Sequence, residues 1–474
     1  MTVRTRFAPS PTGYVHVGSI RTALFAWLLA QQNNGVFILR LEDTDKAREV
    51  AGSGEHIMES LKRLGLQWDE GPDIGGPYGP YKQSERLATY RHWAQKLIDS
   101  GRAYADPYSP EQVERFRTDA KAAKHPFLYR DHRPNSPPKW DGTQPLRFHS
   151  EPKPYHWHDE VLGDLSAGAE VIDDFVLLKA DGYPTYNFAH IIDDHLMQIT
   201  HVIRSQEFTA SVPRYLNLYE ALRLEHPLLA TMPYVMGPGG KKKLSKRDGA
   251  KDVLDYVRQG FLPEALVNFI ATLGWNDGTE QEIFSMDELI KKFSLERVQR
   301  SGAQFDEQRL IWMDGCHIRQ LPLEKLYKKV EHFWPKEATN YDTEYKHRVL
   351  ALVQDRLKYG AELVELTKFF FTDLSVDASL LDSSKQLKKI DRQTIKKLLN
   401  QAKASLEQSD FTLDDVTHRL NELLETTAQK PAVLFSIIRI ATTQAPASPG
   451  LADTLAVLGK ERSLDRIDQA LAAW

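Results

Sequence analysis

The stretch that decides the fold is residues 3–19, VRTRFAPSPTGYVHVGS. Val3 to Ala8 alternates and ends at Pro9, which predicts a strand followed by a loop. A helix is expected next, because apolar residues recur at helical spacing through Ile20, Ala23, Leu24, Trp27 and Leu28. The apolar run VFIL at 36–39 is typical of a strand buried on both faces. Together these segments predict a βαβ crossover and an α/β fold with a parallel sheet.

The loop of this unit, residues 8–19, is suited to hold a nucleotide. In a parallel sheet, ligands bind beyond the carboxyl ends of the strands, beside helix N-termini whose free N–H groups favour phosphate. Gly18 lets a nucleotide lie close to the backbone, and His16 adds a donor for a phosphate oxygen. The pattern His-x-Gly is weak alone, because a histidine that caps a helix is commoner than a catalytic one.

A second segment, residues 237–249, reads GPGGKKKLSKRDG and holds five cations within seven residues. One interpretation is a solvated basic loop, the usual meaning of a charge run. The other is an arm whose lysines stabilise the charge of a departing pyrophosphate. Neither a G-x-x-x-x-G-K-[ST] loop nor a G-x-G-x-x-G turn occurs in the sequence, so P-loop and dinucleotide-binding functions are excluded.

The pattern changes twice along the rest of the chain. Residues 105–160 are rich in Pro, His, Tyr and Arg, and are expected to form an insertion of irregular structure and short strands. Strand-like runs resume at 175–178 and 200–203. From about residue 320 the pattern is helical. Its two apolar stripes run through Val349, Leu352, Val353, Leu357 and Ala361, and through Val416, Leu420, Leu423 and Leu424.

Composition limits the classes of function. The chain has 474 residues, 41% hydrophobic and 27% charged, which suggests about two to four domains, and no run is apolar enough to span a bilayer. The single cysteine, Cys316, excludes an internal disulfide and a thiolate zinc cluster. The net charge of −4 argues against binding nucleic acid by bulk charge but allows a local basic face for one RNA. A cytoplasmic protein is expected.

Longer motifs carry a resemblance to a known family. They are RFAPSPTG at 6–13, RLEDTD at 40–45, GPYKQSER at 79–86, DGYPTY at 181–186, DDH at 193–195 and GFLPEAL at 260–266. HVGS at 16–19 and KLSKR at 243–247 match the "HIGH" and "KMSKS" signatures. The chain therefore resembles class I aminoacyl-tRNA synthetases and, more narrowly, bacterial-type glutamyl-tRNA synthetases, over nearly its whole length.

The resemblance implies an α/β Rossmann-like class I catalytic domain with an inserted acceptor-binding subdomain, followed by an all-α anticodon-binding domain. The expected boundaries are 1–100 and 170–240 for the catalytic core, 101–169 for the insertion, 241–320 for the KMSKS loop with a stem-contact helical region, and 321–474 for the anticodon-binding domain. The implied reaction is ATP-dependent ligation of L-glutamate to the 3′ end of tRNA(Glu) through a glutamyl-adenylate, releasing AMP and diphosphate. Mg²⁺ would accompany ATP, and a monomer is expected.

The resemblance also assigns roles to residues. The catalytic residues are His16, Lys243 and Lys246. The ATP site comprises His16, Gly18, Ser19, Glu207, Lys243, Leu244, Ser245, Lys246 and Arg247. The glutamate site comprises Arg6, Ser10, Glu42, Tyr186, His190 and Arg204. Arg204 suits the side-chain carboxylate through a bidentate pair, and Glu42 suits the ammonium. Arg356 and Arg439 are expected to read anticodon bases, with solvated helix-face cations as the alternative.

Metal binding is expected to be limited to the magnesium of ATP. Many bacterial members carry a cysteine-based zinc site in the insertion, but Tyr104-Ala105-Asp106 holds no cysteine, so no structural zinc is expected. His190, Asp193, Asp194 and His195 are the alternative cluster for a divalent ion. Carboxylate-rich loops at strand ends are common without metal, so no metal site is predicted there. His190 stands where other members carry asparagine, which leaves its contact open.

Four rival functions share parts of this pattern. Glutaminyl-tRNA synthetases share the catalytic half but carry C-terminal β-barrels, which the helical stripes oppose. The short enzymes that glutamylate queuosine on aspartate tRNA lack the anticodon region, which the resemblance implies for this chain. A nucleotidyltransferase that acts on a small molecule would have no function for the helical C-terminal third of the chain. An inactive tRNA-binding paralogue is opposed by the intact His16, Lys246 and Arg204. Whether charging is restricted to tRNA(Glu) stays open.

Overall fold

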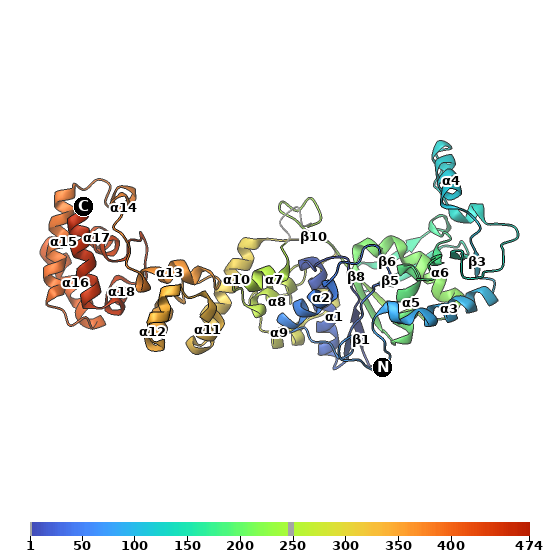
Figure 1. Cartoon of the computed structure of the whole chain (residues 1–474), viewed down its shortest axis with the longest axis horizontal. Helices are drawn as coiled ribbons and strands as arrows, with labels where there is room; N and C mark the ends of the chain where they lie inside the picture. Colours follow the sequence, from blue (N-terminus) through green and yellow to red (C-terminus); the bar gives the residue numbers. More distant parts are fainter. Residues whose placement is uncertain (1, 245–250) are drawn as a thin grey trace. The chain divides into compact units, whose positions relative to one another are not determined.

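A computed structural model of the chain describes residues 2–244 and 251–474. The chain divides into two compact units, drawn with the sequence colours in Figure 1. Unit 1 comprises residues 1–257 and 263–307, and unit 2 comprises residues 258–262 and 308–474. Ser245, Lys246 and Arg247 lie outside the described residues. No helix in the described part of the chain is long and apolar enough to cross a membrane.

Unit 1 combines strands and helices. Its strands are β1 (Arg4–Phe7), β2 (Val36–Leu39), β3 (Ala103–Ala105), β4 (Leu146–Phe148), β5 (Tyr155–Asp159), β6 (Gly163–Ala167), β7 (Val176–Leu178), β8 (His201–Ser205), β9 (Leu228–Met232), β10 (Val235–Met236) and β11 (Ala303–Gln304). Its helices are α1 (Val17–Gln32), α2 (Ser53–Arg63), α3 (Leu87–Asp99), α4 (Pro110–Ala122), α5 (Tyr186–Leu196), α6 (Val212–Leu222), α7 (Val253–Arg258, which ends at the unit boundary), α8 (Pro263–Ala271) and α9 (Met286–Lys292).

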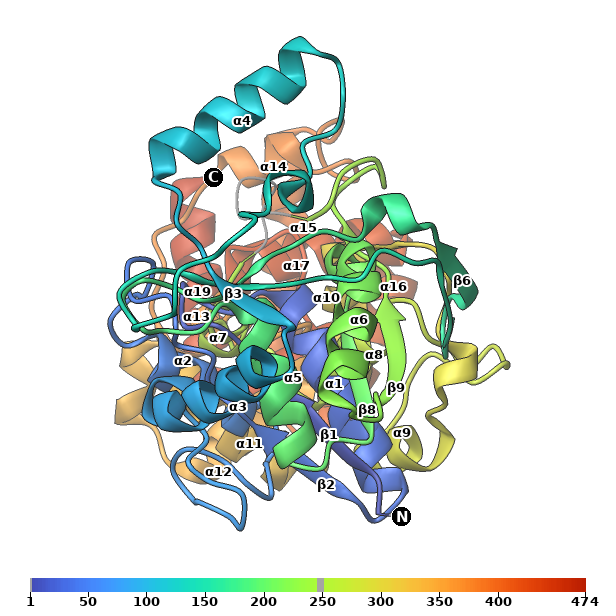
Figure 2. The ribbon, with the colours of Figure 1, turned by 90° about the vertical axis from the view of Figure 1, so that its right-hand side faces the viewer.

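A layer of parallel strands forms the centre of unit 1. β1 pairs with β2, and β8 pairs with β9, both in parallel. The Thr200 N–H donates to the Arg4 carbonyl oxygen at 2.9 Å, so β8 lies beside β1 and gives the order β2-β1-β8-β9. Helix α1 packs against β1, β2 and β8, and Figure 2 shows its ribbon beside β1. The predicted βαβ unit is therefore confirmed.

The insertion contains more regular structure than its sequence suggests. β3, β4 and β7 form an antiparallel sheet, so the run at 175–178 pairs outside the parallel layer. The hairpin β5–β6 joins β9. The expectation of irregular structure over 105–160 is wrong for α4, which stands out from the rest of unit 1 in Figures 1 and 2. None of its residues is buried, so it has no apolar stripe, and only the Ser109–Gln112 capping box marks it. The domain boundaries stay predictions.

Tyr104 and Asp106, where the sequence predicts no zinc site, belong to a cluster of hydrogen-bonded side chains. The Tyr104 hydroxyl donates to Asp174 at 2.8 Å, and the Tyr129 hydroxyl donates to Asp106 at 2.5 Å. Arg147 pairs with the other Asp106 oxygen at 2.6 Å. These contacts join β3, β4 and the loop before β7 through polar side chains.

Unit 2 is helical. Its helices are α10 (Glu307–Gln320, which begins at the unit boundary), α11 (Leu323–Val330), α12 (Thr343–Val353), α13 (Glu362–Phe371), α14 (Ser379–Ser383), α15 (Arg392–Glu407), α16 (Leu413–Thr427), α17 (Pro431–Thr443), α18 (Leu451–Leu458) and α19 (Lys460–Ala473). The main core gathers apolar side chains of α15 to α19. The stripe through Val416, Leu420 and Leu423 is confirmed on α16.

The other predicted stripe does not form one helix. α12 ends at Val353, and Leu357 is buried in the turn that follows. In that turn the Gly360 N–H donates to the Gly260 carbonyl oxygen at 3.0 Å. A Cβ at either glycine would crowd the other's Cα atom and the Phe333 ring, so this close approach favours glycine at both positions.

A substitution at Gly35, just before β2, tests the packing of the βαβ crossover. A Cβ added at Gly35 would overlap the Val3 carbonyl oxygen, which accepts the hydrogen bond from the Val36 N–H. Gly35→Ala is therefore expected to lower the free energy of unfolding by about 1–3 kcal/mol, measured by urea denaturation followed by circular dichroism. Gly54→Ala, on α2, is the control, because within 4 Å its Cβ would meet only the movable end of the Leu41 side chain. Equal midpoints for the two variants would show that β2 has room at Gly35.

Candidate functional site

The carboxyl ends of the parallel strands open into a cavity of about 850 Å³. Arg6 on β1, Glu42 just beyond β2 and Arg204 on β8 line it from the sheet. The loop 8–16 and the first turns of α1 line it as well. This is where α/β sheets bind ligands. The predicted residues that the structure brings together here are Arg6, Ser10, His16, Gly18, Ser19, Glu42, Tyr186, Arg204, Glu207, Lys243 and Leu244.

The N-terminus of α1 presents His16 to this cavity. The Nδ1 atom of His16 accepts a hydrogen bond from the Gly18 N–H at 3.1 Å, so His16 caps the helix. A neutral ring that accepts at Nδ1 carries its proton on Nε2. A Cβ at Gly18 would crowd that ring. The two expectations for His16, a helix cap and a donor facing a ligand, are therefore compatible in one geometry.

Glu42 is a buried carboxyl that lines the cavity. Its Oε1 atom accepts hydrogen bonds from Arg40 at 2.9 Å and from Gln83 at 3.4 Å. Its Oε2 atom has no hydrogen-bond partner among the described residues, so it is available to a ligand. Burial raises the pKa of Glu42 to about 7, although Arg40 acts to lower it.

Arg204 brings a positive charge that no carboxylate neutralises directly. Its side chain is buried, and it makes no hydrogen bond or ion pair within the part of the chain that the structure describes. Its Cζ atom lies 4.8 Å from the centre of the Tyr215 ring and 5.9 Å from that of Phe208. A buried cation held only by aromatic rings is costly, and an anionic ligand would lower that cost.

His190 lies behind the cavity rather than in its wall. Its ring stacks on Tyr186 with the centroids 4.7 Å apart, and its Nδ1–H donates to the Tyr186 carbonyl oxygen at 2.7 Å. Burial lowers the pKa of His190 to about 3, so the ring is neutral. Its contact with Tyr186 supports the cavity wall, which gives the position an indirect part in the site.

The carboxylates beside His190 serve arginines. Asp194 binds Arg6 at 3.1 Å and Arg40 at 2.8 Å, and Asp193 binds Arg86 at 2.7 Å. His195 lies edge-on to the Trp93 ring, 5.4 Å away. Among the described residues, no group of three or more His, Cys, Asp and Glu side chains is arranged to hold a metal ion. The alternative of a divalent metal cluster at these residues is therefore unsupported.

The wall of the cavity beside β10 carries an exposed ion pair. The Lys243 Nζ lies 2.8 Å from the Glu207 Oε2 and 4.7 Å from the centre of the Tyr234 ring. Both charged side chains are about half exposed, and such pairs contribute little to stability. A phosphate can therefore replace Glu207 as the partner of Lys243. Leu244 is buried and donates from its N–H to the Val235 carbonyl oxygen at 2.8 Å, which anchors the basic segment at its start.

Three cavity cations escaped the sequence analysis. Arg21, on α1, donates to the carbonyl oxygens of Leu273 and Pro233, and burial lowers its pKa to about 10. Arg48 and Lys179 line the cavity as well. Arg48 lies three residues after the RLEDTD motif, and this position could have marked it as a candidate site residue. Arg21 lies in an apolar helical pattern, and only the packing shows that it reaches the cavity.

Comparison with known proteins identifies this arrangement. Residues 2–312 match the family described as "tRNA synthetases class I (E and Q), catalytic domain", and residues 325–471 match "Anticodon binding domain". The chain belongs to the class I tRNA synthetases of the E and Q type. The predicted family and fold class are thereby confirmed.

Its relatives are similar over their full length. The chain is 42% identical to a glutamate–tRNA ligase of Dehalococcoides mccartyi, covering 99% of this chain and 97% of the relative. It is 39% identical to glutamate–tRNA ligase 1 of Syntrophomonas wolfei, covering 99% and 96%. Among solved structures, a glutamate tRNA ligase from Elizabethkingia meningosepticum in complex with its amino acid matches with a TM-score of 0.90 at 32% identity, covering all of both chains.

The synthetase's unit 2 brings the two predicted anticodon residues close together. Arg439, on α17, donates from Nε to the Ser448 hydroxyl at 2.9 Å. Burial lowers the pKa of Arg439, and the positive charge of Arg356 lowers it further. Arg356 is exposed just beyond α12, and its side chain has no partner among the described residues. Two neighbouring guanidinium groups favour an anionic or base-carbonyl partner. Anticodon reading by these residues stays a prediction.

The raised pKa of Glu42 predicts how the synthetase responds to pH. Below about pH 7 the Glu42 carboxyl is protonated and loses its attraction for a substrate ammonium, and above it the carboxylate is restored. The KM for the amino acid should therefore rise about tenfold per pH unit below 7 and level off above. The pKa values of Arg40 and Tyr186 are raised and that of Asp194 is lowered, so these surrounding groups keep their charge states in this range.

The measurement is the amino-acid KM in tRNA charging between about pH 5.5 and 8.5. Glu42→Gln should give a higher KM that no longer changes with pH, while the KM for ATP serves as the internal control. A wild-type amino-acid KM that stays flat across this range would remove Glu42 from ammonium binding.

Proposed function

We propose that this synthetase ligates L-glutamate to the 3′ end of tRNA(Glu) through a glutamyl-adenylate, using Mg²⁺-bound ATP as its second substrate. The single observation that carries the choice of glutamate is the buried, unpaired guanidinium of Arg204. An amide side chain would leave that charge without a counter-ion, whereas a carboxylate pairs with it in bidentate fashion. The relatives named glutamate–tRNA ligase support the same choice.

The charges beside the sheet match those of the amino acid. Arg6, Arg40 and Arg86 form one buried ionic network with the carboxyl groups of Glu42, Asp193 and Asp194. Arg204 adds one positive charge, and glutamate carries one net negative charge at neutral pH. In the proposed pose the side-chain carboxylate meets Arg204, the ammonium meets the Glu42 Oε2, and the α-carboxylate lies toward Arg6. Ser10 and Tyr186 offer neutral hydrogen bonds.

Activation needs positioning and charge stabilisation but no protein nucleophile. An α-carboxylate oxygen of glutamate attacks the α-phosphorus of ATP, the bond to the β-phosphate oxygen breaks, and pyrophosphate leaves. His16 donates from Nε2 to the phosphates at the N-terminus of α1, and Lys243 exchanges Glu207 for them. The sequence assigns the same task to Lys246, outside the described residues. Holding the reactants in line supplies much of the rate.

Transfer consumes the adenylate. A ribose hydroxyl at the tRNA 3′ end attacks the activated carbonyl carbon, and AMP leaves with the bonding electrons of the broken C–O bond.

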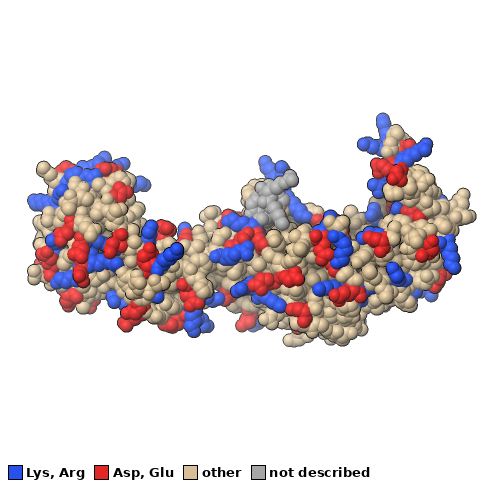
Figure 3. Space-filling view, in the orientation of Figure 1, with Lys and Arg blue, Asp and Glu red and all other residues tan. Residues whose placement is uncertain are grey.

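The face in Figure 3 shows acidic and basic side chains interspersed over each unit, in keeping with the net charge of −4. RNA recognition would therefore rest on local groups such as Arg356 and Arg439 rather than on bulk charge. A cytoplasmic monomer stays a prediction.

The deciding experiment measures charging and ATP–pyrophosphate exchange. The protein is expected to attach glutamate, and not glutamine, to tRNA(Glu), and to catalyse exchange with glutamate only when tRNA is present. Charging with glutamine would overturn the proposed substrate. Exchange without tRNA would overturn only the tRNA-dependent order of steps. Attachment of glutamate to tRNA(Gln) as well would show a non-discriminating enzyme.

The assignment of Arg204 has its own test. Arg204→Gln removes the charge and keeps a polar side chain, so kcat/KM for glutamate should fall by about a hundredfold to several thousandfold while the ATP KM stays near the wild-type value. Glutamate should also lose most of its advantage over glutamine as the competing ligand. The matched control is Arg63→Gln, an exposed arginine on α2 that pairs with Glu59. A kcat/KM within about twofold of wild type for Arg204→Gln would contradict the assignment.

A further inference from the structure

The amino-acid side of the cavity depends on a carboxylate that does not line it. Asp194 lies near the end of α5, is almost fully buried, and is separated from the cavity by the side chains that it holds. Its Oδ1 atom lies 3.1 Å from the Arg6 Nε and 2.8 Å from the Arg40 Nη1, and its Oδ2 atom lies 3.4 Å from the Arg6 Nη2. One carboxylate therefore binds two arginines at once.

The two arginines lead to two different contacts with the substrate. Arg6 lines the cavity itself. Arg40 is completely buried, and its Nη2 donates to the Glu42 Oε1 at 2.9 Å. Because Arg40 and Gln83 both bind Oε1, the Glu42 Oε2 is the oxygen left for the ligand. The position of the Asp194 carboxylate therefore influences the positions of both the Arg6 and the Glu42 side chains.

The neighbours of Asp194 also determine whether its carboxyl group is ionised. Although burial opposes it, the charges of Arg6 and Arg40 hold the pKa of Asp194 at about 2, so the carboxylate is ionised at neutral pH. Apart from the Asp194 carboxylate, the Arg6 side chain has one hydrogen-bond acceptor among the described residues, the Ile203 carbonyl oxygen, 3.2 Å from its Nη1. A guanidinium held at one point can turn, and displacement by about 1 Å is enough to weaken a positioned contact severely.

We propose that Asp194 is a positioning residue for glutamate binding: through Arg6 and through Arg40 it sets where the α-carboxylate and the ammonium of the substrate are received. This inference rests on the proposed function, since it presupposes an amino-acid ligand in the cavity. Asp194 acts only through these side chains and makes no contact with the reacting atoms. It should therefore affect the binding of glutamate far more than the binding of ATP.

The test is Asp194→Asn, which removes the charge and keeps the shape. In tRNA charging, the glutamate KM is expected to rise by about tenfold to a hundredfold, while kcat at saturating glutamate stays within about threefold and the KM values for ATP and tRNA within about twofold. An unchanged glutamate KM, or an equal rise in the ATP KM, would overturn the inference.

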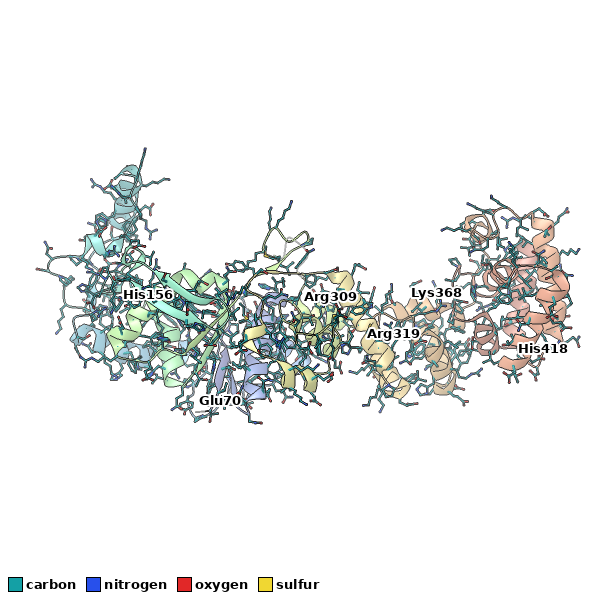
Figure 4. All side chains as sticks on the ribbon, turned by 180° about the vertical axis from the view of Figure 1, so that it is seen from behind. Glu70, His156, Arg309, Arg319, Lys368 and His418 are labelled. Atoms are coloured by element: carbon teal, nitrogen blue, oxygen red, sulfur yellow. The ribbon has the colours of Figure 1, made fainter. Side chains whose placement is uncertain are left out.

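The matched control is a second buried ion pair on the same strand. Arg4, two residues before Arg6 on β1, binds Glu70 at 2.8 Å, and neither side chain lines the cavity. Glu70 is labelled in Figure 4. Glu70→Gln also removes a buried carboxylate from an arginine of β1, so it reproduces the loss of stability without touching Arg6 or Glu42. A rise in glutamate KM equal to that of Asp194→Asn would show a general effect of destabilisation and overturn the inference.

A second variant covers the case in which Asp194→Asn does not fold, as judged by circular dichroism. Arg40→Lys keeps the charge, but a single ammonium replaces the planar fork that spans Asp194 and Glu42. It should raise the glutamate KM selectively, as Asp194→Asn does. A wild-type KM for this variant, or failure of both variants to fold, would assign the network to folding alone and overturn the inference. Wild-type charging in the same assay separates these results from failure of the proposed function, because only the latter abolishes glutamate transfer by the unaltered protein.

Discussion

Buried ion pairs between arginines and carboxylates hold together the amino-acid side of the cavity. Arg40 has no exposed surface, and its charge is met by Glu42 and Asp194. Removing a charged group from water costs several kcal/mol, which only close, well-directed partners offset. Strands β1 and β2, helix α5 and the segment before α3 must therefore keep one relative arrangement. The cavity contacts proposed for the ammonium and the α-carboxylate of the amino acid depend on that arrangement.

The two sides of the cavity differ in how firmly their charges are held. Arg6 and Glu42 are buried and have several partners, whereas Lys243 and Glu207 form one exposed pair. A buried network keeps its geometry with or without a ligand, and this pre-organisation suits recognition of one amino acid. An exposed pair exchanges partners at low cost, which suits a group that must meet phosphates and then release them. The same cavity therefore combines a fixed binding surface with an exchangeable one.

Local patterns predicted those elements whose side chains face a core. The helix after residue 19 and the strand at 36–39 are where their apolar spacing indicates. α4 was missed because it buries no side chain, so no apolar period marks it. The stripe at 349–361 was misjudged because α12 ends at Val353 and the chain then turns, with Gly360 in backbone contact with Gly260, a hundred residues away in sequence. Both differences arise where tertiary contacts, or their absence, override a local period.

The sequence by itself determined the family, the order of the motifs, the adenylation chemistry and eleven of the residues that line the cavity. It could do so because each motif keeps its reactive side chains within a few residues of one strand end or helix start. Tertiary structure alone decided that Asp193 binds Arg86, that Asp194 binds Arg6 and Arg40, and that Arg204 has no ionic partner among the described residues. These ion pairs join segments more than a hundred residues apart in sequence, so they depend on the packing of the parallel layer and α5, which local spacing does not encode.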